Sequence, residues 1–453
     1  MTVDAWAIGP MARHIAWDLR RMAARITHRI MALPTTSLRQ SAGAYVTTSE
    51  QVRAFYERMP YPPPIASLDE HRELYNDPLR RRALFHRIWP ADRPHKDQTI
   101  LIAGCGTFQA ARYAMRESDA HVTAIDISET SLQHTRALQR QYGLDNLEVH
   151  KLAIEDVRRL GRTFDLIVCT GVLHHLVDHR RGLQALRDVL EPQGAIQLMV
   201  YAAYGRAGIY MMQEYCRLLG IGTSPDELRE LGTTVAMLPP THAIAPLVRS
   251  ARDFCRPDAM ADALLNPLDR AFTVTALYAW LERCGLAFGR WVEQAPYLPQ
   301  CGIVAKSPHA ERLASLPAPL QHAAVELFRG TMVSHSVIAY RDDRPAAVNP
   351  ITFDDGRWRS FVPITLPWTM RVRERLPKGS AAVLLNRAHS FTDLVLPIDA
   401  VEASLFDAID GERTLGDILH SAASRGVDEQ AGLDFFERLW RYDQVVFDAS
   451  GRV

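Results

Sequence analysis

Apolar runs of strand length alternate with amphipathic segments of helix length between residues 98 and 201. The apolar runs lie at 98–104, 121–126, 147–153, 164–170 and 195–201. The segments with helical spacing lie at 108–117, 128–141 and 180–190. Because near-continuous apolar strands separated by helices are typical of a parallel sheet covered on both faces, we expect an α/β domain with a doubly wound sheet.

The strand pattern stops after Tyr201 and resumes later in the chain. Between these points, over 205–270, helical pieces are broken by the proline-containing stretches MLPPTH and NPLDR. The pattern then predicts a helix at 273–284 and strands at 287–293 and 301–307. Since α/β sheets bind ligands at the carboxyl ends of their strands, we expect 205–270 to form a helical cap over a binding site.

The first 47 residues combine an amphipathic helix with a linker. Apolar side chains recur at three-four spacing from Ile8 to Ile30, and arginines cover much of the remaining surface. Such a helix can dock on the protein body or on a second copy of the chain, forming a homodimer, or it can lie on an anionic membrane surface. The stretch 33–43 is rich in small and polar residues, which is typical of a linker.

Two further regions follow the α/β domain, which we assign to 48–308. A connector over 309–375 begins with a helical stretch. Residues 376–453 end in three short helices followed by a strand, an order that fits a small α+β module of the winged-helix type. Strands are also expected at 358–366 and 381–386.

Charge and cysteine content narrow the function classes. The 52 basic and 52 acidic side chains balance, so no overall electrostatic footprint for nucleic acid exists and we expect no nucleic-acid partner. The six cysteines contain no CxxC pair, which favours reduced thiols in a cytosolic protein. No apolar run reaches the roughly 18 residues that span a bilayer, and we expect a cytoplasmic protein without a transmembrane segment.

A glycine-rich turn and a carboxylate indicate the ligand class. Gly104 and Gly106 stand where a buried strand turns into a helix, so the backbone can approach a ligand and the helix N-terminus offers free N–H groups. Asp126 ends the next strand, 22 residues after Gly104, from where a carboxylate can reach ribose hydroxyls. Together these features predict a nucleoside-containing ligand.

At these positions the sequence resembles the class I S-adenosylmethionine-dependent methyltransferases. The stretches AGCGT (103–107), VTAIDIS (122–128) and FDLIVCTGVLHHLVD (164–178) carry the resemblance, followed by LRDVLEPQGAIQLMVY. The resemblance implies a Rossmann-like methyltransferase domain with S-adenosyl-L-methionine as its cofactor. It also implies the residues that bind this cofactor, which are Ala103, Gly104, Gly106, Gln109, Asp126, Ile127, Ile154, Glu155, Thr170 and Val172.

Other residues are candidates for the substrate side of the site. We expect His174 and Tyr204 to act as proton acceptors. The expected substrate contacts are Tyr56, Tyr61, His175, Arg206 and Tyr210. Alternatives remain open: the segment carrying Tyr56 and Tyr61 can be a surface anchor, Arg206 can form a stabilising salt bridge, and His174 can be a hydrogen-bonded loop histidine.

The stretch GVLHHLVDH (171–179) also has the residue types of a metal nest. Its histidines follow the buried strand FDLIVC, which places them on a loop facing the cofactor, and Asp178 and His179 are expected to begin the next helix. We therefore expect no metal site.

Three functions remain for the chain. The first is methyl transfer to a small-molecule metabolite beneath the cap. The second is methyl transfer to a peptide or protein docked by the C-terminal module, because LFDAIDGERTLGDIL and FFERLWRYDQVVF resemble winged-helix peptide-binding proteins of pyrroloquinoline quinone biosynthesis. The third is a non-catalytic scaffold, because Ile102 replaces the acidic residue usual in the family and Phe108 replaces a third glycine.

Overall fold

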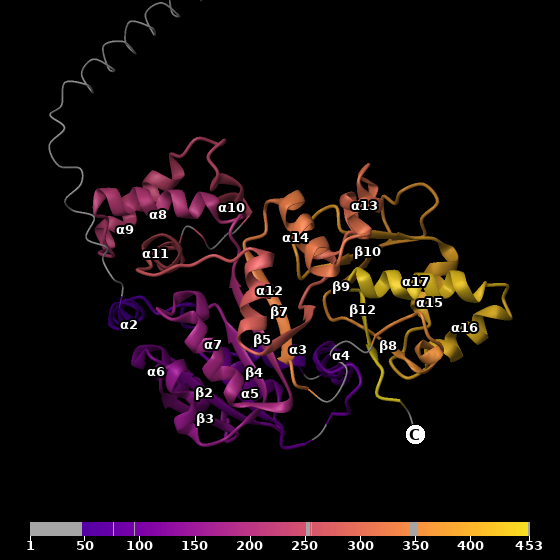
Figure 1. The fold of residues 1–453 in the computed structure, drawn as a ribbon, viewed down its shortest axis with the longest axis horizontal. Coiled ribbons are helices and arrows are strands. Elements are labelled where there is room, and N and C mark those ends of the chain that lie inside the picture. The colour runs from indigo at the N-terminus through magenta and orange to yellow at the C-terminus, as the bar shows by residue number, and fades with distance from the viewer. Residues whose placement is uncertain are drawn as a thin grey trace, which may run out of the picture. The chain divides into compact units, whose positions relative to one another are not determined.

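Seven strands form one sheet in the order β3-β2-β1-β4-β5-β7-β6 (Figure 1). Their bounds are β1 Thr99–Ala103, β2 His121–Asp126, β3 Leu147–Lys151, β4 Phe164–Thr170, β5 Leu190–Tyr201, β6 Leu286–Trp291 and β7 Ser334–Arg341. The pairs among β1 to β5 are parallel, whereas β7 runs antiparallel to both β5 and β6. The predicted doubly wound, Rossmann-like fold is confirmed.

This computed structural model describes residues 48–75, 77–94, 96–250, 254, 256–344 and 351–451, all in one compact unit. The amphipathic helix and linker expected over 1–47 lie outside these residues. Within the described part of the chain, no helix is both long and apolar enough to cross a membrane.

Alternating residues of each central strand pack against helices on opposite faces of the sheet. Ile100 and Ile102 of β1 pack with α5 (Gln109–Arg116) and α6 (Glu129–Tyr142), while Leu101 and Ala103 face the core shared with α7 (His179–Asp188) and α12 (Val274–Arg283). The period of two along the strand therefore buries both faces, as the continuous apolar run predicted.

The prediction of a strand at 301–307 is wrong. Gly302–Lys306 is a 3₁₀ helix, and the strand that lies between β5 and β6 is β7, from the segment assigned to the connector. Gly302 donates its N–H to the Tyr442 hydroxyl at 3.0 Å, and Ile303 donates to Asp393 at 2.9 Å. These N–H groups are thus committed to the C-terminal region and unavailable for a strand ladder.

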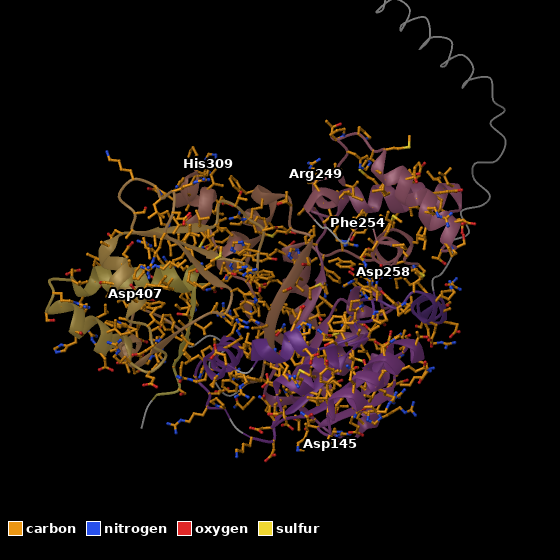
Figure 2. The ribbon with its side chains drawn as sticks, turned by 180° about the vertical axis from the view of Figure 1, so that it is seen from behind. Asp145, Arg249, Phe254, Asp258, His309 and Asp407 are labelled. Carbon is orange, nitrogen blue, oxygen red and sulfur yellow. The ribbon has the colours of Figure 1, made fainter. Side chains whose placement is uncertain are left out.

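The described part of the segment between β5 and α12 contains four helices, where helical pieces were expected over 205–270. They are α8 Ala207–Leu219, α9 Pro225–Ala236, α10 Ala245–Ser250 and α11 Pro257–Leu265. They share an apolar core with Phe55 of α2 (Ser49–Arg58), above which they lie in Figure 1. Phe254 and Asp258 mark this cap in the reverse view of Figure 2. Two more helices, α3 (Asp69–Tyr75) and α4 (Pro78–Ile88), lead into β1.

The C-terminal region has its own apolar core, formed by residues from Ile351 to Phe447. Its helices are α15 Ala400–Asp407, α16 Leu415–Ala423 and α17 Glu429–Arg441, preceded in the chain by α13 Ala310–Ala314 and α14 Ala318–Arg329. Its strands are β8 Val362–Thr365, β9 Thr369–Val372, β10 Ala382–Asn386, β11 Val395–Ile398 and β12 Val445–Asp448. The three helices and final strand expected from the sequence are confirmed, and β12 pairs antiparallel with β8. The winged-helix identity of this region stays a prediction.

Candidate active site

A cavity of about 730 Å³ lies at the carboxyl ends of β1, β2, β4 and β5, beneath α2. This volume is within the range of small-molecule and cofactor sites. Most of the residues expected from the sequence line it, namely Gly104, Gly106, Gln109, Asp126, Ile127, Ile154, Glu155, Thr170, Val172, Tyr56, Tyr61 and His175. The sheet edge predicted to bind the ligand is therefore the edge that carries the cavity.

The turn after β1 requires glycine for two reasons. Gly104 and Gly106 have φ of 73° and 57°, a left-handed conformation that side chains disfavour. A Cβ on Gly104 would also lie 2.4 Å from Cγ2 of Val172, and one on Gly106 would lie 3.3 Å from the carbonyl oxygen of Tyr61. The loops after β1 and β4 and the turn at Tyr61 thus meet closely around the cavity.

Asp126 lines the cavity at the end of β2. Its carboxylate accepts hydrogen bonds from the backbone N–H groups of Gly106 and Ser128, each at 2.9 Å. Burial raises the pKa of Asp126 above its usual value, although these hydrogen bonds oppose the change. Each oxygen of a carboxylate has two lone pairs, so Asp126 can still accept from a ligand hydroxyl.

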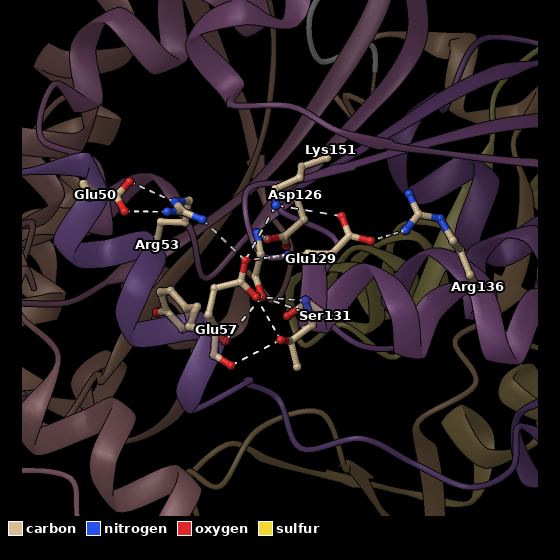
Figure 3. Close-up of polar contacts among 11 residues, drawn as sticks. Glu50, Arg53, Glu57, Asp126, Glu129, Ser131, Arg136 and Lys151 are labelled. Carbon is tan, nitrogen blue, oxygen red and sulfur yellow. Dashed lines mark hydrogen bonds and ion pairs between the residues drawn. The ribbon is translucent and has the colours of Figure 1, made fainter.

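Glu57 anchors α2 to the first turn of α6 (Figure 3). Its carboxylate accepts from the backbone N–H groups of Glu129 at 2.9 Å and Thr130 at 3.0 Å, which belong to the first turn of α6. Burial alone would raise the pKa of Glu57, but the hydrogen bonds with Thr130 and Glu129 outweigh it and lower the pKa to about 2. A carboxylate at a helix N-terminus also interacts favourably with the helix dipole.

Glu57, which lies beside the cavity lining, and four lining residues of α2 were not expected from the sequence; the four are Ser49, Glu50, Val52 and Arg53. Val52 and Arg53 line the cavity, and Arg53 is paired with Glu50, another lining residue (Figure 3). A local signal for the helix itself existed, because Thr48 and Gln51 form a capping box. No local signal shows that this helix covers the sheet, because that depends on residues 70 or more positions away, such as Thr130.

Asp262 of α11 joins the cap to both α2 and β5. Its carboxylate accepts from the hydroxyl of Tyr56 at 3.0 Å and from that of Tyr201 at 3.2 Å, and Asn266 donates to the Tyr56 oxygen at 2.9 Å. Burial first, and the Asp262 charge second, raise the pKa of both tyrosines well above 10. Both hydroxyls therefore stay neutral. Neither Asp262 nor Tyr201 was expected from the sequence.

The two adjacent histidines occupy different positions. His174 is fully buried beside the Tyr201 ring, 3.9 Å between ring centroids, and it does not line the cavity. Burial, helped by the charges of His175 and Arg206, lowers the pKa of His174 well below its usual value. His174 is thus a neutral core histidine, and its neighbour His175 is the one that lines the cavity.

The remaining expected residues also lie outside the cavity lining. Arg206 forms a buried ion pair with Asp269 at 2.7 Å and lies over the Tyr201 ring, so the salt-bridge alternative describes it. Tyr210 contacts the same pair through its hydroxyl. Tyr204 is 43% exposed, and Ala103 is buried in the core. The described residues contain no cluster of three or more metal-binding side chains.

Comparison with known proteins shows which family model and which relatives the chain matches. Residues 100–194 match a family model described as a methyltransferase domain. An uncharacterized protein of Synechococcus is 33% identical over 236 residues, which is 50% of this chain and 56% of that protein. A glycine/sarcosine/dimethylglycine N-methyltransferase of Actinopolyspora halophila is 34% identical over 98 residues, which is 21% of this chain and 17% of that protein. The matches thus cover little more than half of the first relative's length and less than a fifth of the second's.

The solved structure of PKMT2 from Rickettsia typhi has the same fold. It aligns with a TM-score of 0.59 at 16% identity, covering 86% of this chain and 77% of that one, and it has also been solved in complex with AdoHcy. The alignment extends well beyond the matched methyltransferase domain. From the strand order, the glycine turn, Asp126 and these matches, the domain around residues 100–194 belongs to the class I S-adenosylmethionine-dependent methyltransferases.

Proposed function

We propose that this chain transfers a methyl group from S-adenosylmethionine to a small molecule held in the cavity beneath α2. The observation that carries the proposal is the composition of the cavity wall. Its lining includes the glycine turn and Asp126, which are hydrogen-bonded to each other, and also Tyr56, Tyr201 and His175, whose rings contact one another. A nucleoside cofactor and an acceptor can therefore contact different groups of lining residues within one cavity.

The residues present fit this cofactor. Asp126 can accept from ribose hydroxyls, and Ile127 and Ile154 offer apolar contacts to an adenine ring. On the methionine side, Gln109 donates from Nε2 to the Thr170 hydroxyl at 2.7 Å, so both side chains are held at the cavity wall. When bound, the cofactor would supply an electrophilic methyl group on a sulfonium. The protein then has to align the acceptor and exclude water.

Phe108 does not argue for the scaffold alternative. Its ring stacks on His71, 6.4 Å between centroids, at the start of α5. A cavity of about 730 Å³ exists with this ring in its wall. Ile102, the other departure from the family pattern, is fully buried in the core and lies outside the cavity lining.

The cavity also favours a small acceptor over a peptide docked by the C-terminal region. All its lining residues fall between Ser49 and Tyr201. No described residue beyond Tyr201 contributes to the lining. The C-terminal region instead contacts the methyltransferase sheet through Arg290 and Asp443. A role for this region in delivering a peptide has no support from the cavity geometry.

Calorimetric titration with S-adenosylmethionine and S-adenosylhomocysteine tests the cofactor part. We expect binding by the intact chain and at least tenfold weaker binding by Asp126→Ala, with Asp145→Ala, an exposed residue before β3, as a matched control. Absence of binding by the intact chain would contradict the proposal. Thermal unfolding of each variant separates a binding defect from a folding defect.

Transfer of a labelled methyl group tests the acceptor part. The chain is incubated with S-[methyl-¹⁴C]adenosylmethionine and a cell extract, which is then divided by ultrafiltration. We expect the label in the low-mass fraction, and Asp126→Ala should abolish it. Label that stays with protein would overturn the small-molecule assignment and favour a protein acceptor.

A further inference from the structure

His175 has a defined tautomer. Its Nδ1 lies 2.6 Å from the carbonyl oxygen of Leu268, in the segment that follows α11. A carbonyl oxygen only accepts hydrogen bonds, so Nδ1 must carry the proton in this contact. In the neutral ring, Nε2 then presents an unprotonated lone pair.

The Nε2 atom of His175 is buried and has no hydrogen-bond partner in the described structure. Buried polar atoms in folded proteins nearly always have a partner, so an unpartnered nitrogen in a cavity-lining residue points to a ligand that completes it once the neighbouring side chains shift to admit one. His175 follows Val172 by three positions, and Val172 contacts the glycine turn at Gly104. The nitrogen therefore belongs to the loop that faces the cofactor turn.

Three aromatic rings hold the imidazole in place. The ring centroids of His174, Tyr201 and Tyr56 lie 4.2, 5.6 and 6.0 Å from that of His175. The orientation of the His175 ring is thus set by three elements: the loop after β4, which carries His174, the strand β5 and the helix α2. A base has to be held in a fixed position relative to the proton it accepts, and this packing provides that.

Four other groups near His175 are poorly suited to accept a proton. The hydroxyls of Tyr56 and Tyr201 both donate to Asp262 and stay neutral. Asp126 is engaged by two backbone N–H groups. His174 has unpartnered ring nitrogens, but it does not line the cavity. Among these residues, His175 alone combines a free lone pair with a place in the cavity wall.

We propose that His175 Nε2 is the proton acceptor of methyl transfer and that the substrate is therefore methylated on a nitrogen or oxygen that bears a proton. This inference rests on the proposed function. The acceptor's lone pair forms the bond to the methyl carbon, and the carbon–sulfur bond breaks with its electron pair left on sulfur. The acceptor's proton moves to Nε2, and the resulting imidazolium later releases it to water.

Sinefungin probes this nitrogen directly. It carries an amine-bearing carbon in place of the methylated sulfur, so its protonated amine offers N–H donors near the position of the transferred methyl group, whereas S-adenosylhomocysteine offers none. A charge-assisted hydrogen bond to Nε2 should make the intact chain bind sinefungin about tenfold more tightly than S-adenosylhomocysteine. The ratio of the two dissociation constants is measured by calorimetry.

The matched variants are His175→Phe and His174→Phe, which remove adjacent imidazoles. We expect the sinefungin preference to disappear in the first variant, with S-adenosylhomocysteine bound within about threefold of the intact chain, and to persist in the second. A preference unchanged in His175→Phe overturns the role of His175 but leaves the proposed function intact. If the intact chain binds neither compound, both proposals fail.

A measurement on the unchanged protein guards against variants that do not fold. In ¹⁵N-histidine spectra of the intact chain, we expect one histidine whose Nε2 has the chemical shift of an unprotonated nitrogen and whose resonance moves when sinefungin is added. Assignment of that signal to His175 supports the proposal. A His175 signal with a protonated Nε2, or one unaffected by sinefungin, overturns it.

Discussion

Arg290 of β6 and Asp443, which follows α17, form a buried ion pair with 3.0 Å between nitrogen and oxygen. Both residues are less than 10% exposed. Asp443 also accepts from the backbone N–H groups of Gln294 at 2.6 Å and Ala295 at 2.8 Å. One carboxylate therefore joins the C-terminal region to the edge of the methyltransferase sheet.

Removing one partner of this pair should be costly. We expect Asp443→Ala to lower the free energy of unfolding by about 3–5 kcal/mol, because it leaves the buried Arg290 guanidinium without its hydrogen-bonded carboxylate. The double variant Arg290→Met with Asp443→Ala should recover part of this loss. Chemical denaturation of the intact chain, the two single variants and the double variant gives the coupling energy, and additive losses would show that the pair does not act as a unit.

The contact between Glu57 and the N-terminus of α6 should make α2 sensitive to acid. The pKa of Glu57 is lowered from 4.5 to about 2, so its stabilisation is fully present above pH 4.5 and is lost as the pH falls toward 2. Glu57→Gln should cost about 0.5–2 kcal/mol at pH 7, as loss of a helix cap does. The difference in unfolding free energy between the two proteins should shrink between pH 5 and pH 2. A constant difference would contradict this assignment.

Replacing Gly104 with alanine should carry two separate costs, a steric clash with Val172 and the strain of a left-handed backbone. Gly143, at the end of α6, has φ of 60° with nothing within 4 Å of an added Cβ, whereas a Cβ at Gly104 would lie 2.4 Å from Val172. Gly143→Ala should cost about 1–2 kcal/mol from the left-handed conformation. Gly104→Ala should cost about 1–3 kcal/mol more from overpacking and should weaken cofactor binding. Adding Val172→Ala to Gly104→Ala should restore part of the lost stability. If it does not, the clash between position 104 and Val172 is not the cause of the loss.

Asp262 should control how firmly the cap and α2 are held. Asp262→Ala leaves the hydroxyls of Tyr56 and Tyr201 without their acceptor, which should cost about 1–3 kcal/mol. Asp258→Ala, on the same helix, serves as the control, because among the described residues Asp258 forms its ion pair with nearby Arg256. Hydrogen exchange should accelerate in both α11 and α2 in the first variant. Faster exchange in α11 alone would show that Tyr56 does not couple the two elements.

Much of the cofactor side of the site could be predicted from local sequence. The apolar runs predicted β1 to β5, because a strand buried on both faces needs apolar residues throughout. Gly104, Gly106 and Asp126 could be found because strand ends and left-handed turns restrict the residue types that fit there. These features depend on short stretches of chain, and the structure brings them together at one cavity.

The substrate side depended on contacts between distant residues. Arg206 has the chemistry to bind an anion, but Asp269, 63 positions away, neutralises it. His174 and His175 are identical in type, and only their packing against Tyr201 and Leu268 distinguishes the core residue from the cavity residue.

The sequence by itself determined strands β1 to β5, the glycine turn and the carboxylate at the end of β2, because local backbone geometry and burial restrict those positions. Only the tertiary structure decided that β7 comes from 334–341, that α2 covers the cavity and that Asp262 holds two tyrosines. The physical reason is that the free energy of an ion pair or a hydrogen bond depends on which partner folding brings within reach, and residue type alone does not specify that partner.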